Sequence, residues 1–90
     1  MIRSCRDKRT ERFVEGKRVP AFDGFRDAAR RTLARLHAAT TLSDFRPGDH
    51  LEALRGDRDG QHSIRINEQF RVCFVWRDGD ALDVEIVDYH

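Results

Sequence analysis

Residues 50–90 hold most of the polar side chains that have chemistry to offer. A guanidinium group can clamp a phosphate through paired donors, and an imidazole or phenol beside it can move protons near neutral pH. Together such groups form a minimum set for cutting a phosphodiester without a metal, because RNA would supply its own 2′-hydroxyl as the nucleophile. The candidates are Arg55, Arg65, Arg71, Asp88, Tyr89 and His90.

A structural interpretation of the same side chains stays open. Arg71 could pair with Asp88 or Glu85 across a sheet, since opposite charges often face each other on neighbouring strands. Phe70 and Trp76 could stack on bases, although the hydrophobic core has the larger claim on them. Spacing alone does not choose between these interpretations of Arg71.

We expect neither a metal nor a cofactor. The histidines lack the paired Cys/His spacing of a zinc site; they are His37, His50, His62 and His90. Histidine prefers the surface, so His62, which begins a predicted strand, is interpreted as an edge residue. Gly56 and Gly60 enclose a turn that no helix follows, unlike a phosphate-binding loop.

Three runs rich in β-branched and aromatic residues predict an antiparallel meander over residues 61–67, 70–76 and 82–89. An Asp-Gly pair at 78–79 suits the hairpin between the last two runs, and residues 51–54 are extended or a short strand. In the last strand we expect Leu82, Val84 and Ile86 to share one face. Neighbouring strands lie about 4.8 Å apart, so Arg65, Arg71 and the C-terminal residues should converge on one surface.

Two helices are predicted before the sheet. The first spans residues 8–15 after Asp7, with Phe13 and Val14 as apolar contacts and Gly16 as its stop. The second spans about residues 21–39, where apolar residues recur every three or four positions: Phe22, Phe25, Ala29, Leu33, Leu36 and Ala39. The fold class is therefore α+β, with two N-terminal helices packed on a small twisted, mainly antiparallel sheet, in one domain over residues 1–90.

Charge is unevenly distributed along the 90 residues. The net charge is only +1, yet residues 1–36 carry eleven Lys/Arg against five Asp/Glu. This imbalance indicates a basic face. No signal peptide or apolar run of about 18 residues is present, so we expect a cytoplasmic protein with free thiols. Cys73 alternates with apolar neighbours and is expected to be buried.

Several separated motifs, in order over nearly the whole chain, resemble HigB-type toxins of the RelE/ParE superfamily. They are the opening Met-Ile-Arg-Ser, Leu-Glu-Ala-Leu-Arg-Gly-Asp-Arg from Leu51, Ser-Ile-Arg-Ile-Asn from Ser63, Gln-Phe-Arg-Val-Cys-Phe from Gln69, and the terminal Val-Asp-Tyr-His. The resemblance implies a RelE-like fold and an mRNA endonuclease that acts in the ribosomal decoding site. It also implies a HigA-like helix-turn-helix antitoxin, with operator DNA bound through that antitoxin.

The resemblance implies which residues carry activity: Arg55, Arg71, Asp88, Tyr89 and His90. Arg65, Arg58, Gln69 and Glu52 are the implied RNA-binding residues. Glu52 stands where some relatives have a histidine, Gln69 where some have an asparagine, and Arg55 where a lysine is frequent, so the acid–base pair stays open. Arg26, Arg30, Arg31 and Arg35 form a basic helical face that could meet an acidic antitoxin or ribosomal RNA.

Two rival functions belong to the same resemblance. A ParE-like gyrase poison would bind a protein target and cleave nothing, so its toxicity would not need His90. An inactive homologue would act only in the repressor complex with its antitoxin, and would arrest no growth when expressed without it. The terminal Asp88-Tyr89-His90 and Arg71 favour the nuclease.

Overall fold

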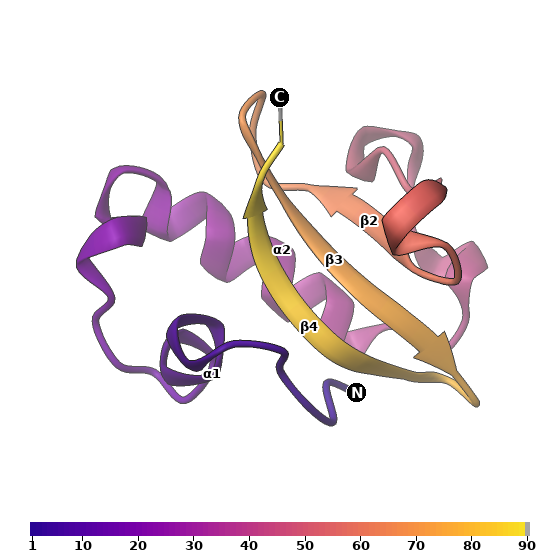
Figure 1. The fold of residues 1–90 in the computed structure, drawn as a ribbon, viewed down its shortest axis with the longest axis horizontal. Helices are drawn as coiled ribbons and strands as arrows, with labels where there is room; N and C mark the ends of the chain where they lie inside the picture. Colours follow the sequence, from indigo (N-terminus) through magenta and orange to yellow (C-terminus); the bar gives the residue numbers. More distant parts are fainter. Residues whose placement is uncertain (90) are drawn as a thin grey trace.

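The computed structural model describes residues 1–89, in which a four-stranded antiparallel sheet is backed by helices (Figure 1). The strand order β1-β2-β3-β4 follows the chain, which confirms the predicted meander and the α+β fold class. The helices are α1 (Lys8–Val14) and α2 (Arg26–Ala38); the strands are β1 (Glu52–Ala53), β2 (His62–Arg65), β3 (Phe70–Arg77) and β4 (Asp80–Asp88). Among the described residues, neither helix has the length and apolar character needed to cross a bilayer.

Helix α1 ends in the way that its glycine predicts. Gly16 has φ +93°, and the Lys17 amide donates to the Arg12 carbonyl at 3.0 Å, as in a Schellman motif. Phe13 is buried as expected, but the prediction for Val14 is wrong, because its side chain is 36% exposed. Thr10 takes that inward position instead, and its hydroxyl accepts a bond from an amide of β4.

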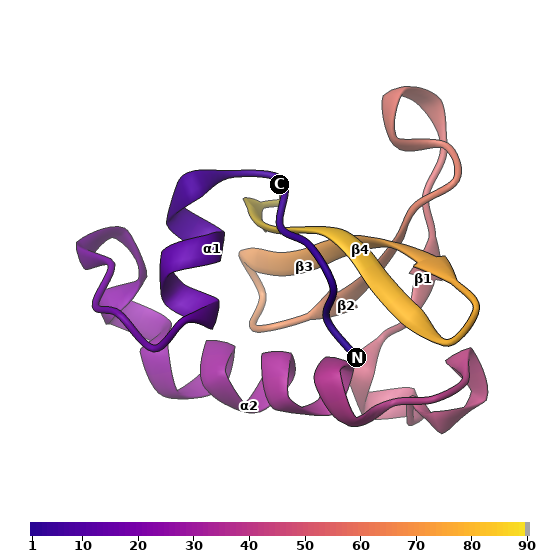
Figure 2. The ribbon, with the colours of Figure 1, turned by 90° about the horizontal axis from the view of Figure 1, so that it is seen from below.

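The predicted second helix begins as a 3₁₀ turn over Pro20–Phe25 and continues as α2. Gly24 lies in the 3₁₀ part, where its low helix propensity is least costly. The predicted apolar stripe faces inward: Phe22, Ala29, Leu33, Leu36 and Ala39 are buried, and Phe25 is partly buried. Figure 2 shows α2 lying along one side of the sheet, with α1 standing beside it.

The β3–β4 hairpin contains a bulge that the sequence pattern did not reveal. Its turn is the predicted Asp78-Gly79 pair, with φ of 52° and 81°. Between Cys73 and Val75, strand β4 carries one extra residue, and Asp83 has φ 51°. The extra residue reverses the alternation, so Ala81 is buried and Leu82 is not, contrary to the prediction for Leu82.

The N-terminal segment runs alongside the outer edge of β4. Residues 1–6, expected as a possible short strand, form two isolated parallel bridges, Ile2 with Ala81 and Cys5 with Val84. Backbone amides of residues 3 and 6 donate to carbonyls of residues 81 and 84 at 2.8 and 2.9 Å. This edge of the sheet is therefore paired.

Aromatic residues fill the space between α2 and the sheet, as expected. Phe70 stacks on Phe25 with ring centroids 4.0 Å apart, and Trp76 meets Phe74 edge-on. Cys73 is fully buried, as predicted. The prediction that His62 is an edge residue is wrong, because it lies inside the sheet between Ala53 and Phe74.

Candidate active site

Arg71 is the anchored centre of the face of the sheet turned away from α2. Its side chain is 10% exposed, and Nη1 donates to Ser63 Oγ at 3.0 Å. The His50 carbonyl accepts from Nη1 and Nη2 at 3.5 and 3.4 Å, and Nη2 lies 3.5 Å from Glu52 Oε1. Neighbouring strands therefore fix the direction of this guanidinium group, which is the preorganisation that anion binding requires.

The cross-strand pairing considered for Arg71 takes a different form. Glu85 pairs with Arg58, whose Nη1 lies 3.1 Å from Glu85 Oε1. Arg71 instead forms its ion pair with Glu52. Glu52 is 53% exposed. Because an exposed carboxylate is well solvated, it can give way to a phosphate at little cost.

A second arginine stands directly beside the first. Arg65 on β2 is the in-register partner of Arg71 on β3. Two like charges in register destabilise a sheet. Each arginine has one carboxylate near it: Glu52 lies 3.5 Å from Arg71, and Glu68 lies 3.9 Å from Arg65. The Arg65 side chain is 34% exposed and has donors to spare. The pair is thus arranged to receive an anion between them.

Tyr89 completes a shallow pocket on this face. Its ring centroid lies 5.3 Å from Arg71 Cζ, within the range of a cation–π contact. The open pocket has a volume of about 280 Å³. Its lining residues are Glu52, Arg65, Asn67, Glu68, Arg71 and Tyr89. The predicted convergence of Arg65, Arg71 and the C-terminal strand is therefore confirmed as far as residue 89.

Gln69 and Asp88 hold the end of β4 in place. Gln69 Nε2 donates to Asp88 Oδ2 at 3.1 Å, and the Tyr89 amide donates to the Gln69 carbonyl at 2.6 Å. Asn67 Oδ1 accepts from the amides of residues 69 and 70 at 2.8 and 2.7 Å, which fixes the β2–β3 turn. These bonds position Tyr89 over Arg71. His90 lies outside the described residues.

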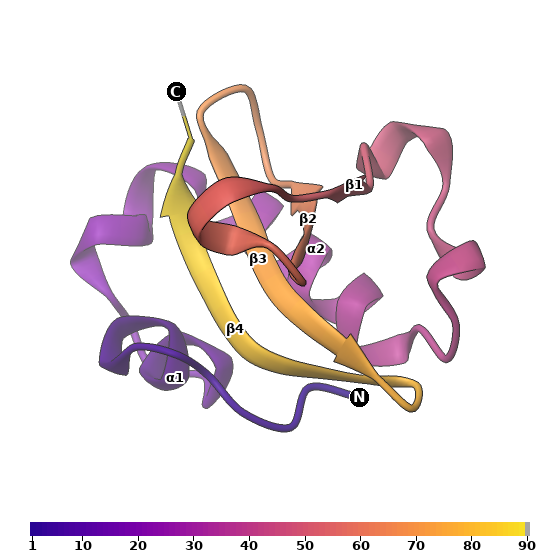
Figure 3. The same ribbon diagram turned by 45° about the vertical axis from the view of Figure 1, so that its right-hand side comes forward.

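Two other predicted residues lie away from the pocket. Arg58 belongs to the 3₁₀ turn Gly56–Arg58 and bonds Glu85 and Gln61, each at 3.1 Å. Arg55 is the exposed residue before that turn and does not line the pocket. Figure 3 shows the turn crossing in front of the sheet. Arg58 therefore ties the turn to β4.

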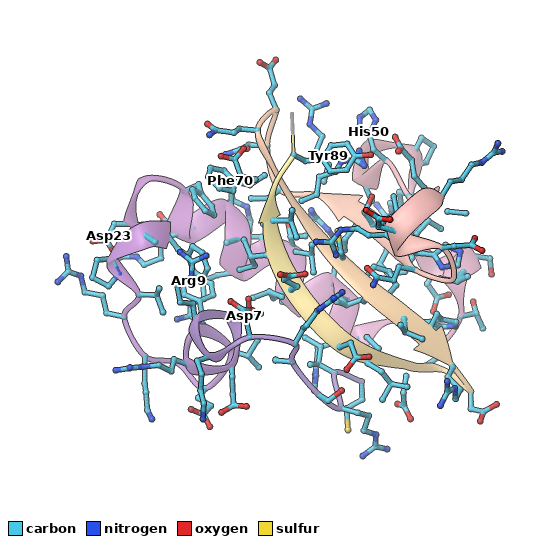
Figure 4. All side chains as sticks on the ribbon, viewed as in Figure 1. Asp7, Arg9, Asp23, His50, Phe70 and Tyr89 are labelled. Atoms are coloured by element: carbon cyan, nitrogen blue, oxygen red, sulfur yellow. The ribbon has the colours of Figure 1, made fainter. Side chains whose placement is uncertain are left out.

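His50 is a site residue that sequence analysis missed. Its Nε2 lies 3.4 Å from Arg65 Nη1, and its carbonyl bonds Arg71. Figure 4 shows His50 and Tyr89 at the same end of the sheet. The available signal was the Arg-Pro-Gly-Asp turn just before it, which leaves His50 in the left-handed region with φ 50°. Histidine is among the residues enriched there.

Other reactive groups on the described residues do not form a second centre. Cys73 shares a row with Ser63 and Glu85, but burial raises the pKa of its thiol and keeps it protonated. Among residues 1–89 no three His, Cys, Asp or Glu side chains are grouped as metal ligands. The chemistry of this face therefore rests on arginine, tyrosine, histidine and carboxylate groups.

Fold and site together define a small α+β protein with an arginine-centred anion pocket on the open face of its sheet. A family model described as the RelE-like toxin of type II toxin–antitoxin system HigB matches residues 3–90, and the chain belongs to this family. It is 39% identical over 89 residues to Toxin HigB-1 of Vibrio cholerae serotype O1, covering 92% of each chain. It is 34% identical over 73 residues to Endoribonuclease HigB of Proteus vulgaris, covering 80% of this chain and 77% of that one. Membership of a toxin–antitoxin family implies an antitoxin partner.

Proposed function

We propose that this chain is a toxin that cleaves mRNA in the decoding site of the ribosome, with no metal or cofactor. The observation that carries the proposal is the in-register pair of Arg65 and Arg71 beside Tyr89. The anchored guanidinium group of Arg71 and the more exposed one of Arg65 would bind a phosphodiester through several charge-assisted bonds, and the tyrosine ring offers a surface on which a base can stack. Similarity to a protein named as an endoribonuclease supports RNA as the substrate.

Each candidate residue has a proposed role. Arg71 binds the scissile phosphate and the charge that develops on it. The same role is proposed for Arg55 once RNA is bound, because Arg55 stands outside the pocket in the free protein. His90 is the principal proton-transfer group, and Tyr89 orients the RNA or shares in proton transfer. Asp88 holds His90 or Arg71 in place. The proposed RNA-binding residues are Arg65, Arg58, Gln69 and Glu52.

We also propose the finer identities of the partners. The antitoxin is a HigA-like helix-turn-helix protein that carries the complex to operator DNA, and the toxin acts on ribosomes in the cytoplasm. The basic N-terminal region supports contacts with such polyanionic or acidic partners, since it concentrates Lys and Arg in residues 1–36. Residues 1–90 are proposed to be one toxin domain.

The test compares wild type with Arg71→Ala and His90→Ala on programmed ribosomes, with mRNA cleavage detected by primer extension. Both variants are expected to lose at least about a hundredfold in rate, as a phosphate clamp and a proton-transfer group would. Arg77→Ala is the matched control, because Arg77 is an exposed arginine at the other end of the same strand. It should cleave like wild type.

The outcome also separates the rival functions. A folded wild-type protein that arrests growth without cleaving mRNA would favour a gyrase poison. A folded protein that neither cleaves mRNA nor arrests growth would favour an inactive homologue that acts only with its antitoxin.

A further inference from the structure

Cleavage by an RNA 2′-hydroxyl needs two proton transfers, and only one has a principal candidate so far. The attacking 2′-oxygen must lose a proton, and the departing 5′-oxygen must gain one. If His90 serves one oxygen, a second group must serve the other. The sequence leaves this role open to Glu52, whose carboxylate lies 3.5 Å from the Arg71 guanidinium. That carboxylate is already engaged by Arg71 in the structure.

Within residues 1–89, the histidine whose ring contacts the arginine pair is His50. Its Nε2 lies 3.4 Å from Arg65 Nη1. A guanidinium group can only donate hydrogen bonds, so in this contact Nε2 is the acceptor and carries its lone pair toward the pocket. A ring nitrogen that accepts a hydrogen bond can also accept a proton, and this orientation presents His50 as a base.

The backbone of His50 is held by contacts that reach from α2 to β3. The 3₁₀ turn Pro47–Asp49 precedes it, and the His50 amide donates to the Pro47 carbonyl at 3.1 Å. Buried Asp49 is fixed by Arg35 of α2, with Arg35 Nε 2.9 Å from Asp49 Oδ1. On its other side the His50 carbonyl bonds Arg71. A left-handed residue held at both ends is a common feature of functional sites.

We propose that His50 is the general base of this toxin, an inference that rests on the proposed nuclease function. The bound phosphate draws Arg65 toward itself and frees Nε2, which takes the proton of the 2′-hydroxyl. The 2′-oxygen then forms a bond to phosphorus while the bond from phosphorus to the 5′-oxygen breaks. His90 gives its proton to that 5′-oxygen. The products are a 2′,3′-cyclic phosphate and a free 5′-hydroxyl, and no oxidant or co-reactant is consumed.

Ionisable groups lie around His50 on several elements. Arg65 of β2 and Arg71 of β3 contact it directly, and Glu52 of β1, Glu68 of the β2–β3 turn and Tyr89 line the pocket that these two arginines share. A general base acts in its unprotonated form, so the single-turnover rate should rise with pH. Replacing His50 should remove that rise, whereas a merely structural substitution would leave it.

The experiment measures single-turnover mRNA cleavage on programmed ribosomes as a function of pH for His50→Asn and His50→Gly. Both residues tolerate φ 50°, so the turn is expected to fold. His50→Asn should lower the rate by about a hundredfold or more. Added imidazole should restore much of the rate of His50→Gly and leave wild type unchanged. Glu52→Gln tests the competing base, and His37→Asn is the matched control on a histidine of α2.

Each outcome decides the proposal. A rate for His50→Asn within about threefold of wild type overturns it. A large loss without imidazole rescue and with an unchanged pH profile makes His50 a positioning residue only, which also overturns it. A loss in Glu52→Gln as large as in His50→Asn, again without rescue, assigns the base to Glu52. If wild type cleaves no mRNA, the proposed function fails as well, so the two failures are distinguishable. Melting temperatures and antitoxin binding establish that each variant is folded.

Discussion

The ring of Tyr89 lies against the guanidinium group of Arg71. Mutation can separate the contribution of this ring to activity from the contribution of the tyrosine hydroxyl. Tyr89→Phe keeps the ring 5.3 Å from Arg71, whereas Tyr89→Ala removes both parts. If the ring orients RNA by stacking, Tyr89→Phe should retain most activity and Tyr89→Ala should lose about tenfold or more. If the hydroxyl shares proton transfer, Tyr89→Phe should lose nearly as much as Tyr89→Ala. Cleavage rates on saturating ribosomes measure the difference.

Cys5 gives a prediction about pH. Burial, with smaller contributions from Glu11, Asp7 and Glu15, raises the pKa of its thiol to about 11. The folded state therefore keeps this proton to a higher pH than the unfolded chain, whose thiol pKa is about 8.5. The contribution of the neutral thiol to stability is present below pH 8.5 or so and is lost as pH rises toward 11.

The reaction of Cys5 with Ellman's reagent measures this shift. In a Cys73→Ala background, folded Cys5 should react slowly at pH 8 and faster with each unit up to about 11. The urea-unfolded protein is the control and should react quickly at pH 8. A folded-state midpoint near 8.5 would contradict the shift.

Sequence reasoning was most successful for site residues that lie on strands. The alternation of β2 and β3 placed Arg65 and Arg71 on one face, and the register set them side by side. It was least successful for residues whose direction depends on turns. Glu68 lines the pocket from one turn and His50 contacts Arg65 from another, and no local sequence pattern predicts the direction of a side chain that follows a turn.

At the scale of elements, α2 and the turn Pro47–Asp49 are joined by the ion pair of Arg35 with Asp49. Arg35→Ala would leave the buried Asp49 carboxylate with fewer partners, although the Arg46 amide still donates to it at 2.9 Å. We expect a loss of about 1–3 kcal/mol in the free energy of unfolding, measured in urea. If the turn holds His50, the cleavage rate should also fall. Arg31→Ala, an exposed neighbour on α2, should change neither quantity.

The bulge in β4 shows why element boundaries were easier to predict than side-chain facing. The strands were expected at residues 61–67, 70–76 and 82–89 and lie within a few residues of those positions. The facing of Leu82 was wrong because one extra residue opposite Phe74 changes which side chains point inward. Nothing in the local sequence distinguishes a bulged strand from a regular one, since the extra residue is accommodated by packing across the sheet.

For the whole molecule, the basic helical face is smaller than the sequence indicated. Arg30 donates to the Phe13 carbonyl and lies over the Phe13 ring, and Arg35 binds Asp49. Arg26, Arg31 and Arg35 are all exposed, and Arg35 alone of these three is tied to the buried Asp49. Arg26→Glu with Arg31→Glu should weaken association with antitoxin or ribosomes, more strongly at low salt. Arg77→Glu, which makes half of that charge change outside the helical face, is the control. If neither association changes, this face is only solvated surface.

A single domain should unfold as one unit. The fluorescence of Trp76, which packs against the core, and far-UV circular dichroism, which reports the helices and strands, should give coincident urea transitions. Two separate midpoints would show that the helices and the sheet are independent units and would contradict the one-domain prediction.

The pairing of residues 1–6 with β4 sets the order of events when the protein is made. The amino group of Met1 lies 3.5 Å from Asp80, and Ile2 bridges to Ala81, so residues 1 and 2 cannot make these contacts until residues 80 and 81 have been synthesised. Contacts between residues so distant in sequence form late in folding. A nascent chain therefore completes neither its sheet nor its pocket until β4 and Tyr89 have been synthesised.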